Sequence, residues 1–196
     1  MKLLASLTSP YARKLRILAL ELDLDVELVE TAPMADAPDF LAVNPLGKVP
    51  ALLVGDDAIV DSRVIAGYLL ALAPGNAILP DAGPAHWHGR TTEAIADGIL
   101  DAAITLRFNA GQGVTSGLGV DRQYRAIDRA VLALAGRVGD GCAGEFGWGE
   151  ICTVVAVEYL DLRWPMIDWR ATAPGLATLQ ACHCDRAAMI STRPPQ

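Results

Sequence analysis

Apolar and polar positions divide the start of the chain into short strands and a longer helix. Lys2–Leu7 is a short apolar run that predicts a buried strand. Pro10 then opens an amphipathic segment whose leucines recur at helical spacing, which predicts a helix over residues 10–22. Alternation in Val26–Glu30 predicts a second strand. A strand, a helix and a strand within about 30 residues indicate a right-handed βαβ unit.

The next segment predicts a hairpin followed by a helix. Asn44–Pro50 is rich in turn-forming residues and leads into the apolar run Ala51–Val54. A Gly-Asp-Asp turn predicts a hairpin with a returning strand over residues 58–60. Asp61-Ser62 supplies an N-cap for a helix whose apolar face runs over residues 64–72. The order over this half is therefore βαβ, a loop, and ββα.

Composition changes between Pro74 and Pro84, where Gly, Pro, Asn and Asp predict a linker. Beyond it no convincing strand pair occurs, and apolar residues at spacings of three and four predict at least four helices, over 86–108, 121–138, 150–164 and 174–189. We expect the Gly-rich stretches 111–119 and 136–149 to separate the first three helices. These patterns predict an α/β domain over residues 1–75, a linker over 76–84 and an all-helical domain over 85–196.

Charge and composition narrow the class of partner. Sixteen Lys and Arg against 23 Asp and Glu give a net charge of −7 without any basic block, which argues against nucleic acid and anionic membrane surfaces as partners. No run of about 18 apolar residues predicts a membrane-spanning helix. Pro10 and Arg13 cut the first apolar run short, so we do not expect a signal peptide. A small-molecule partner is therefore expected.

The four cysteines, Cys142, Cys152, Cys182 and Cys184, form no CxxC pair, which predicts reduced thiols and a cytoplasmic location. Cys182-His183-Cys184 contains metal-ligating residue types. However, adjacent residues on a helix point to different faces, and no second pair lies at zinc-like spacing. We therefore predict no metal site.

The start of the first helix is the place where the sequence points to chemistry. Thr8 and Ser9 lie between the first strand and this helix, where unpaired N–H groups and the positive end of the helix dipole converge. Such a place stabilises a phosphate, a carboxylate or a thiolate, although Ser9 would also serve simply as an N-cap. Asp61-Ser62 forms a second helix start. One ligand with negative groups at both ends would bridge the two.

Three motifs carry a resemblance to a known family. They are Thr8–Lys14 (TSPYARK), Asn44–Pro50 (NPLGKVP) and Asp61-Ser62. In this order and spacing they resemble the glutathione-binding motifs of cytosolic glutathione S-transferases, and nearly the whole chain resembles the small bacterial branch of that family. The resemblance implies an α/β thioredoxin-like N-terminal domain followed by an all-α C-terminal domain. It also implies glutathione as co-substrate, no metal, a small hydrophobic electrophile and a homodimer.

The resemblance places Ser9 where the family has its thiol-activating residue. A hydroxyl donor at a helix N-terminus favours the thiolate of glutathione, which is the nucleophile. Thr8 is a neighbouring hydroxyl able to do the same, whereas Tyr11 lies inside the first helix and is expected to form a wall of the site or part of the core.

The other two motifs would bind the glutathione backbone. Pro50 resembles the family's cis-proline, which would expose the backbone of Val49 to the cysteinyl part of glutathione, and it would also form a tight turn. Ser62 would bind the γ-glutamyl carboxylate and Asp61 would face the ammonium group. Lys48 would reach the glycyl carboxylate or remain solvated.

Two features depart from the family pattern or stay open. The family usually opens a core helix of the second domain with Ser/Thr-x-x-Asp, whereas this chain has Gly-Trp-Gly-Glu over residues 147–150, which weakens the cap by about 1 kcal/mol. Asp97 and Asp101 lie one helical turn apart. With Arg107 they would line a cleft or a dimer interface, or form a solvated helix face.

Three functions are compatible with these motifs. The first is a glutathione S-transferase that attacks an electrophile held between the domains, with Leu7, Phe108 and Trp164 among the apolar wall residues. The second is a glutathione-dependent reductase of disulfides or peroxides. The absence of cysteine at Ser9 and Ala12 argues against it, because a mixed disulfide needs a protein thiolate. The third is a non-catalytic module that binds glutathione or a protein.

Overall fold

The chain forms two compact units in the structure, a computed structural model that describes residues 1–138 and 146–195. One unit contains residues 1–76 together with 186–196, and the other contains residues 77–185. The C-terminal residues 186–196 therefore belong to the first unit, although the sequence pattern assigned them to the helical domain. Half of the Gly-rich stretch 136–149, residues 139–145 with Cys142 among them, lies outside the described residues.

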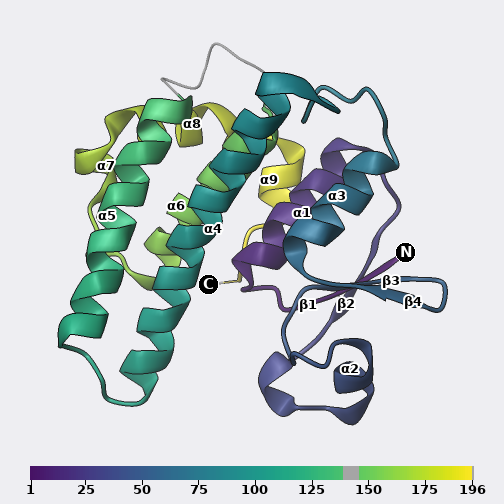
Figure 1. The fold of residues 1–196 in the computed structure, drawn as a ribbon, viewed down its shortest axis with the longest axis horizontal. Helices are drawn as coiled ribbons and strands as arrows, with labels where there is room; N and C mark the ends of the chain where they lie inside the picture. Colours follow the sequence, from purple (N-terminus) through teal and green to yellow (C-terminus); the bar gives the residue numbers. More distant parts are fainter. Residues whose placement is uncertain (139–145, 196) are drawn as a thin grey trace. The chain divides into compact units, whose positions relative to one another are not determined.

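The first unit is built on a four-stranded mixed sheet (Figure 1). Its strands are β1 (Lys2–Ala5), β2 (Glu27–Glu30), β3 (Ala51–Val54) and β4 (Asp57–Ile59), in the order β2-β1-β3-β4. β1 and β2 are parallel, β3 is antiparallel to β1, and β4 is antiparallel to β3. The thioredoxin-like α/β arrangement implied by the resemblance is therefore present, with the first strand two residues shorter than its apolar run.

Helices cover both faces of this sheet (Figure 1). They are α1 (Pro10–Glu21), α2 (Pro38–Val43) and α3 (Ser62–Ala71). The unit also contains α9 (Ala187–Ser191), which packs against α1, and a 3-10 turn at Pro33–Ala35. α1 packs against α3, and Leu15 of α1 and Ile65 of α3 are fully buried. On the other face, Phe40 of α2 clusters with Leu4 and Ala51.

The C-terminal segment is fastened to α1 by charged side chains. Arg186 donates two hydrogen bonds to Glu21, Nε to Oε1 at 2.9 Å and Nη2 to Oε2 at 2.6 Å. The hydrogen bond to Glu21 raises the pKa of the Arg186 guanidinium above its ordinary value. Arg16 donates to the Ser191 carbonyl at 3.3 Å, and burial together with nearby Arg13 lowers the pKa of Arg16.

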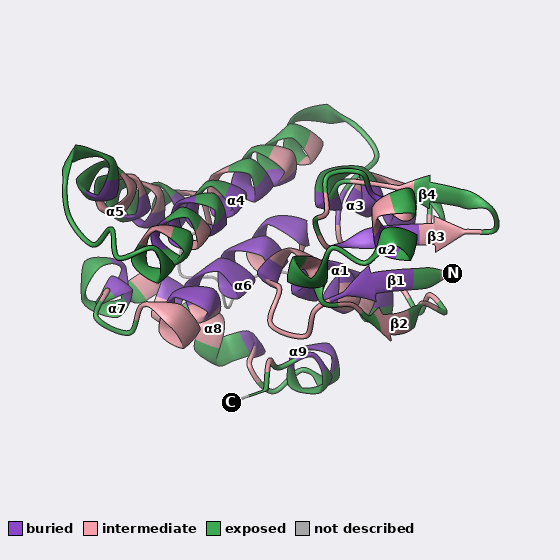
Figure 2. Ribbon diagram, turned by 90° about the horizontal axis from the view of Figure 1, so that it is seen from below, coloured by how far each residue is buried: buried purple, intermediate pink, exposed green. Residues whose placement is uncertain are grey.

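The second unit contains helices joined by loops, and no strand occurs among its described residues. It contains α4 (Gly83–Gly111), α5 (Leu118–Val138), α6 (Trp148–Arg163), α7 (Trp169–Thr172) and α8 (Pro174–His183). α4 packs against both α5 and α6, and α6 is buried along most of its length (Figure 2). The single helix expected over 174–189 is wrong, because Arg186 adopts an extended backbone (φ −63°, ψ 141°) between α8 and α9.

The structure tests two expectations about the second unit, one about the cap of α6 and one about the acidic residues of α4. Gly147, the N-cap of α6, provides no side-chain hydrogen bond to the helix, as the lost hydroxyl predicts. A solvated face over Asp97 and Asp101 is wrong for Asp97, which is 2% exposed, whereas Asp101 and Arg107 are exposed.

Cys152 and Cys184 carry free thiols, whereas Cys182 is disulfide-bonded. The expectation of reduced cysteines is therefore wrong for Cys182. Among the residues that the structure describes, every helix is too short or too polar to cross a lipid bilayer.

Candidate functional site

Ser9 is the N-cap of α1. Its backbone is extended (φ −76°, ψ 119°), its carbonyl accepts the Arg13 N–H at 3.0 Å, and its Oγ accepts the Ala12 N–H at 3.3 Å. Pro10 occupies the first helical position, where a missing N–H costs nothing. Because Oγ uses a lone pair for the cap, its hydroxyl hydrogen is left to donate, and it donates to no described residue.

Two other hydroxyls lie near this helix start, and the structure distinguishes their positions. Thr8 Oγ1 lies 3.3 Å from Ser6 Oγ, and either oxygen is able to donate. Thr8 therefore has a hydroxyl partner in the loop, and it does not cap the helix. Tyr11 is half-buried in the first turn of α1. Ser9 alone of the three combines a helix-capping position with an available hydrogen.

The loop before β3 is held by Asn44, which is 2% exposed. Asn44 Nδ2 donates to the Lys48 carbonyl at 2.6 Å, and Asn44 Oδ1 accepts the Leu46 N–H at 3.1 Å. Gly47 has φ +62°, a left-handed conformation that favours glycine. From the sequence, only Lys48, Val49 and Pro50 of this stretch received roles in binding. The positioning role of Asn44 was missed, because it depends on the burial of the side-chain amide.

This loop presents the Lys48–Pro50 segment. The Val49–Pro50 peptide bond is cis, in agreement with the geometry that the resemblance implies. No described residue hydrogen-bonds to the backbone N–H or C=O of half-buried Val49. The Lys48 side chain is exposed. The loop therefore offers a backbone donor and acceptor at Val49 together with the exposed cation of Lys48.

Asp61 and Ser62 begin α3. Asp61 is the exposed N-cap, and its Oδ1 accepts the Arg63 N–H at 3.0 Å. Ser62, the first helical residue, is 5% exposed. The Val60–Asp61 peptide bond is also cis. As at Ser9, a helix N-terminus presents backbone N–H groups beside a polar side chain.

Sheet register brings the three motifs to one end of the sheet. Leu4 pairs with Ala51 in an antiparallel ladder, so Pro50 lies at the carboxyl end of β1, where the chain continues toward Ser9. Leu52 pairs with Ile59, and continuing that ladder sets Asp61 opposite Pro50. Two helix N-termini and an unpaired backbone segment therefore gather at this end. Such an arrangement suits an extended ligand that carries anionic groups and an amide backbone.

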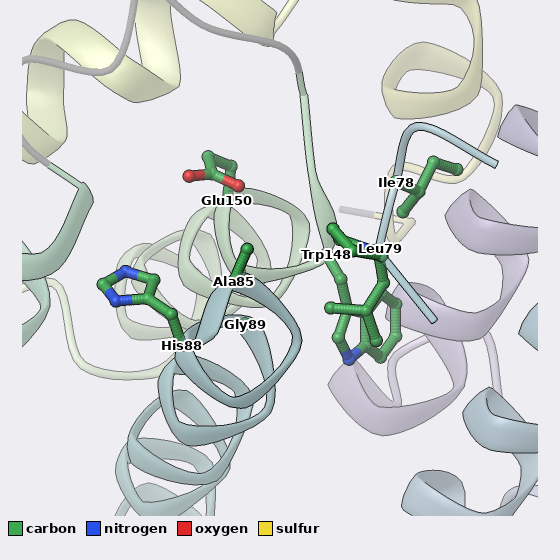
Figure 3. A pocket seen from close by; sticks show the side chains of 9 residues that line it. Ile78, Leu79, Ala85, His88, Gly89, Trp148 and Glu150 are labelled. Carbon is green, nitrogen blue, oxygen red and sulfur yellow. The ribbon is translucent and has the colours of Figure 1, made fainter. Parts of the chain in front are cut away.

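The helical unit has a small pocket of about 220 Å³ near the start of α6 (Figure 3). It is lined by Ile78, Leu79, Pro80, Ala85, His88, Gly89, Trp148, Gly149 and Glu150. A Cβ added at Gly147 would lie 2.8 Å from Glu150 Oε2, so this carboxylate folds back over the helix start. His88 Nε2 lies 3.2 Å from the Arg137 carbonyl. In the pocket, His88 and Glu150 therefore lie against neighbouring parts of the helical unit. No group of three or more potential metal ligands occurs within the described residues.

Comparison with known proteins identifies the family. Residues 3–77 match the family described as "Glutathione S-transferase, N-terminal domain", and residues 119–178 match "Glutathione S-transferase, C-terminal domain". The uncharacterized GST-like protein YibF of Escherichia coli K12 is 32% identical over 201 residues, which cover 100% of both chains. The chain therefore belongs to the glutathione S-transferase family.

Solved structures of similar proteins share the whole fold. A glutathione S-transferase from Methylobacillus flagellatus with glutathione bound has a TM-score of 0.89 at 32% identity, covering 99% of both chains. A glutathione transferase family member from Pseudomonas fluorescens with bound glutathione has a TM-score of 0.88 at 32% identity, covering 100% of this chain and 99% of that one. With bound S-(propanoic acid)-glutathione, a family member from the same species has a TM-score of 0.83 at 32% identity, covering 100% of both chains.

Proposed function

We propose that this protein is a glutathione S-transferase that conjugates the glutathione thiolate to a small hydrophobic electrophile, and that Ser9 stabilises the thiolate. The observation that carries the proposal is the available hydroxyl hydrogen of Ser9 at the N-terminus of α1. Glutathione bound to relatives that are 32% identical supports glutathione as the co-substrate.

The other motif residues would hold the glutathione backbone. Val49 would pair its backbone N–H and C=O with the cysteinyl residue, with Pro50 fixing the direction of that segment. Ser62 and the N-terminus of α3 would bind the γ-glutamyl carboxylate, and Asp61 would face the ammonium group. Lys48 is exposed on the same loop and would pair with the glycyl carboxylate.

The chemistry follows from the charge that develops on sulfur. A hydrogen bond to the charged form of a thiol lowers its pKa, and the positive end of α1 acts in the same direction. The thiolate sulfur then forms a bond to the electrophilic carbon, and the leaving group departs with the electron pair of the bond that breaks. The S-(propanoic acid)-glutathione bound to the Pseudomonas relative is glutathione with a substituent on sulfur, which supports this position as the reacting atom.

The helical unit would supply the apolar surface for the electrophile. Phe108 on α4 is 51% exposed, and Trp164 at the end of α6 is half-buried. A reductase is not favoured, because Ser9 and Ala12 leave no thiolate at the start of α1 to form a mixed disulfide.

We further propose that the protein is a cytoplasmic homodimer. Members of this family usually pair through both domains, and exposed apolar side chains lie on α3 (Val64) and at its C-cap (Leu72), where a second copy would cover them. Sedimentation at micromolar concentration is expected to give twice the 20.7 kDa of one chain. A stable 20.7 kDa species would contradict the dimer.

The proposal is tested by binding and turnover on the same preparation. Calorimetry with reduced glutathione measures binding, and conjugation of 1-chloro-2,4-dinitrobenzene, compared with heat-denatured protein, measures transfer. Binding with conjugation supports a transferase. Binding without conjugation of any electrophile would indicate a non-catalytic module, reduction of a disulfide in place of conjugation would indicate a reductase, and absence of binding would refute the proposal.

A further inference from the structure

The small pocket near the start of α6 has a buried, apolar floor (Figure 3). Leu79, Gly89 and Trp148 line it and are buried in the helical unit. The Trp148 N–H donates to the Ile78 carbonyl at 2.7 Å, so the segment before α4 is fastened to the start of α6. A Cβ added at Gly89 would lie 2.6 Å from Leu79 Cδ1. Close packing within one unit therefore fixes the floor of the pocket.

The accessible part of the pocket is apolar except for two side chains. Pro80 and Ala85 are exposed, and Ile78 is half-buried. His88 and Glu150 are the two lining residues with titratable side chains. A flat ring bound here would cover apolar surface on Pro80 and Ala85, which favours binding. The volume of about 220 Å³ fits one ring with a short substituent, since a cavity of about 150 Å³ holds one benzene molecule.

Glu150 supplies a carboxylate to this pocket. It is half-buried and forms no hydrogen bond or ion pair with any described residue. In a capping box, an acid at this position accepts the backbone N–H of the cap residue, yet that bond is not formed with Gly147. The carboxylate occupies the space that a cap side chain would take, because a Cβ at Gly147 would lie 2.8 Å from Glu150 Oε2. Both oxygens of Glu150 therefore keep their capacity to accept hydrogen bonds.

The cationic and titratable groups nearest the pocket have other partners. Arg137 donates from Nε to Thr92 Oγ1 at 2.9 Å and from Nη2 to the His88 carbonyl at 3.0 Å. His88 Nε2 lies 3.2 Å from the Arg137 carbonyl, and it carries the hydrogen of this bond because a carbonyl only accepts. Within residues 1–138 and 146–195, neither side chain forms an ion pair with Glu150. The charge of Glu150 is therefore left for a partner from outside the chain.

We propose that this pocket, the Glu150 pocket, binds a small organic ammonium ion that carries one flat apolar ring. The ammonium group donates to the Glu150 carboxylate, and the ring covers Pro80 and Ala85. The net charge of −7 attracts cations in general, whereas the pocket adds a charge-assisted contact at one position. The site lies wholly within the helical unit and uses none of the glutathione motifs. The inference therefore goes beyond the proposed transferase function and does not depend on it.

Benzylamine and benzyl alcohol test the pocket, because they share one ring and nearly the same size but differ in charge. Calorimetry measures the binding of each to the full chain without glutathione. We expect benzylamine to bind about tenfold more tightly or better, since one charge-assisted contact is worth about that factor. Glu150→Gln keeps the size of the side chain and is expected to reduce this preference to about twofold or less. Equal affinity of the unaltered protein for both compounds, or no binding of benzylamine, would overturn the inference.

Glu30→Gln is the matched control. Glu30 is an exposed glutamate of β2 that forms no ion pair with a described residue and does not line the pocket. The substitution removes the same charge as Glu150→Gln and is expected to leave the preference for benzylamine unchanged. An equal fall in the two variants would show that net charge alone attracts the cation, and the inference would be wrong.

Ala85→Leu locates the site without changing any charge. Leucine adds carbon atoms at an exposed position in the first turn of α4, where they would occupy the space of the bound ring. We expect the affinity for both compounds to fall about fivefold or more. Unchanged affinity for benzylamine would place its binding outside the pocket and contradict the inference. If Glu150→Gln does not fold, the preference of the unaltered protein and the effect of Ala85→Leu decide the outcome.

The same preparation separates this inference from the proposed function. Binding of benzylamine that depends on Glu150 and Ala85 supports the pocket even if glutathione is neither bound nor conjugated. Conjugation with glutathione but without binding of benzylamine would leave the transferase function intact and overturn the inference.

Discussion

Gly149 at the start of α6 lies directly against Thr92 of α4. A Cβ added at Gly149 would come within 3.1 Å of Thr92 Cγ2 and 3.2 Å of Thr92 Cβ. Thr92 has no freedom to move away, because it is fully buried, donates to the His88 carbonyl at 2.9 Å and accepts from Arg137 Nε at 2.9 Å. The small size of Gly149 therefore sets how closely the two central helices of the helical unit approach.

Gly149→Ala is expected to destabilise the protein by about 1–3 kcal/mol, the usual cost of an added methyl in a close-packed contact. Denaturant unfolding measures the change. Gly98→Ala is the matched control, since Gly98 lies at an exposed position in the middle of α4, with no atom within 4 Å of an added Cβ. There the gain in helix propensity predicts a neutral to stabilising effect of up to about 1 kcal/mol. Equal effects at both glycines would show that Thr92 yields to the new methyl.

Glu21→Gln is expected to loosen the C-terminal segment. The substitution keeps the size of the side chain but removes the negative charge of the carboxylate to which Arg186 donates two hydrogen bonds. A loss of about 0.5–1.5 kcal/mol in unfolding free energy is expected for this paired, partly buried geometry. Lys2→Gln breaks the exposed Lys2–Glu27 pair, 3.5 Å long, and should cost less than about 0.5 kcal/mol. A smaller effect at Glu21 than at Lys2 would contradict this assignment.

The sequence predicts the long elements well because their apolar periodicity extends over several turns. α1, α4, α5 and α6 each begin and end within a few residues of the segments that their spacing indicates. α2 was not predicted, since it has six residues and a single buried side chain, Phe40, from which no period can be read. The Arg186–Glu21 contact joins residues 165 positions apart and leaves no local pattern.

In the candidate site too, features that depend on neighbouring residues could be predicted, whereas features that depend on distant residues could not. Helix-capping residues such as Ser9 and Asp61 could be predicted, because a cap depends on the chain within three residues of it. The role of Asn44 depends on the burial of its side chain, and the burial of Asp97 depends on the neighbouring helices. The spacing of residues in the sequence shows neither of these. The convergence of the three motifs at one end of the sheet required the strand register.

Asp61→Asn separates the binding role of Asp61 from its structural role. Asparagine caps a helix about as well as aspartate, so stability should be retained, while the charge that we propose faces the glutathione ammonium is lost. We expect roughly 3- to 10-fold weaker binding of glutathione by calorimetry, as for a partly exposed ion pair. Asp61→Ala should bind equally weakly and also lose about 1 kcal/mol of stability, because the Arg63 N–H loses its acceptor. Unchanged affinity in Asp61→Asn would exclude Asp61 from ammonium recognition.

Ser9→Ala tests which hydroxyl activates the thiol. The substitution removes one charge-assisted hydrogen bond to the thiolate, worth about 1.5–3 kcal/mol, whereas the dipole of α1 remains. Because the lost donor favoured the charged form, the pKa of the bound thiol should rise. The pH profile of kcat should move to higher pH, and turnover near neutral pH should fall about tenfold or more. Ultraviolet titration of bound glutathione and the pH dependence of conjugation measure both effects.

Affinity separates this role from a general loss of the site. Val49, Asp61 and Ser62 would still hold the backbone and the γ-glutamyl end, so the Kd of glutathione should change much less than turnover. Thr8→Ala is the control and should leave the thiol titration nearly unchanged, since Thr8 Oγ1 lies against Ser6 Oγ and does not cap α1. If Ser9→Ala titrates like the parent while Thr8→Ala or Tyr11→Phe does not, a different hydroxyl stabilises the thiolate. In that case the helix start remains the binding site, and the assignment of Ser9 is wrong.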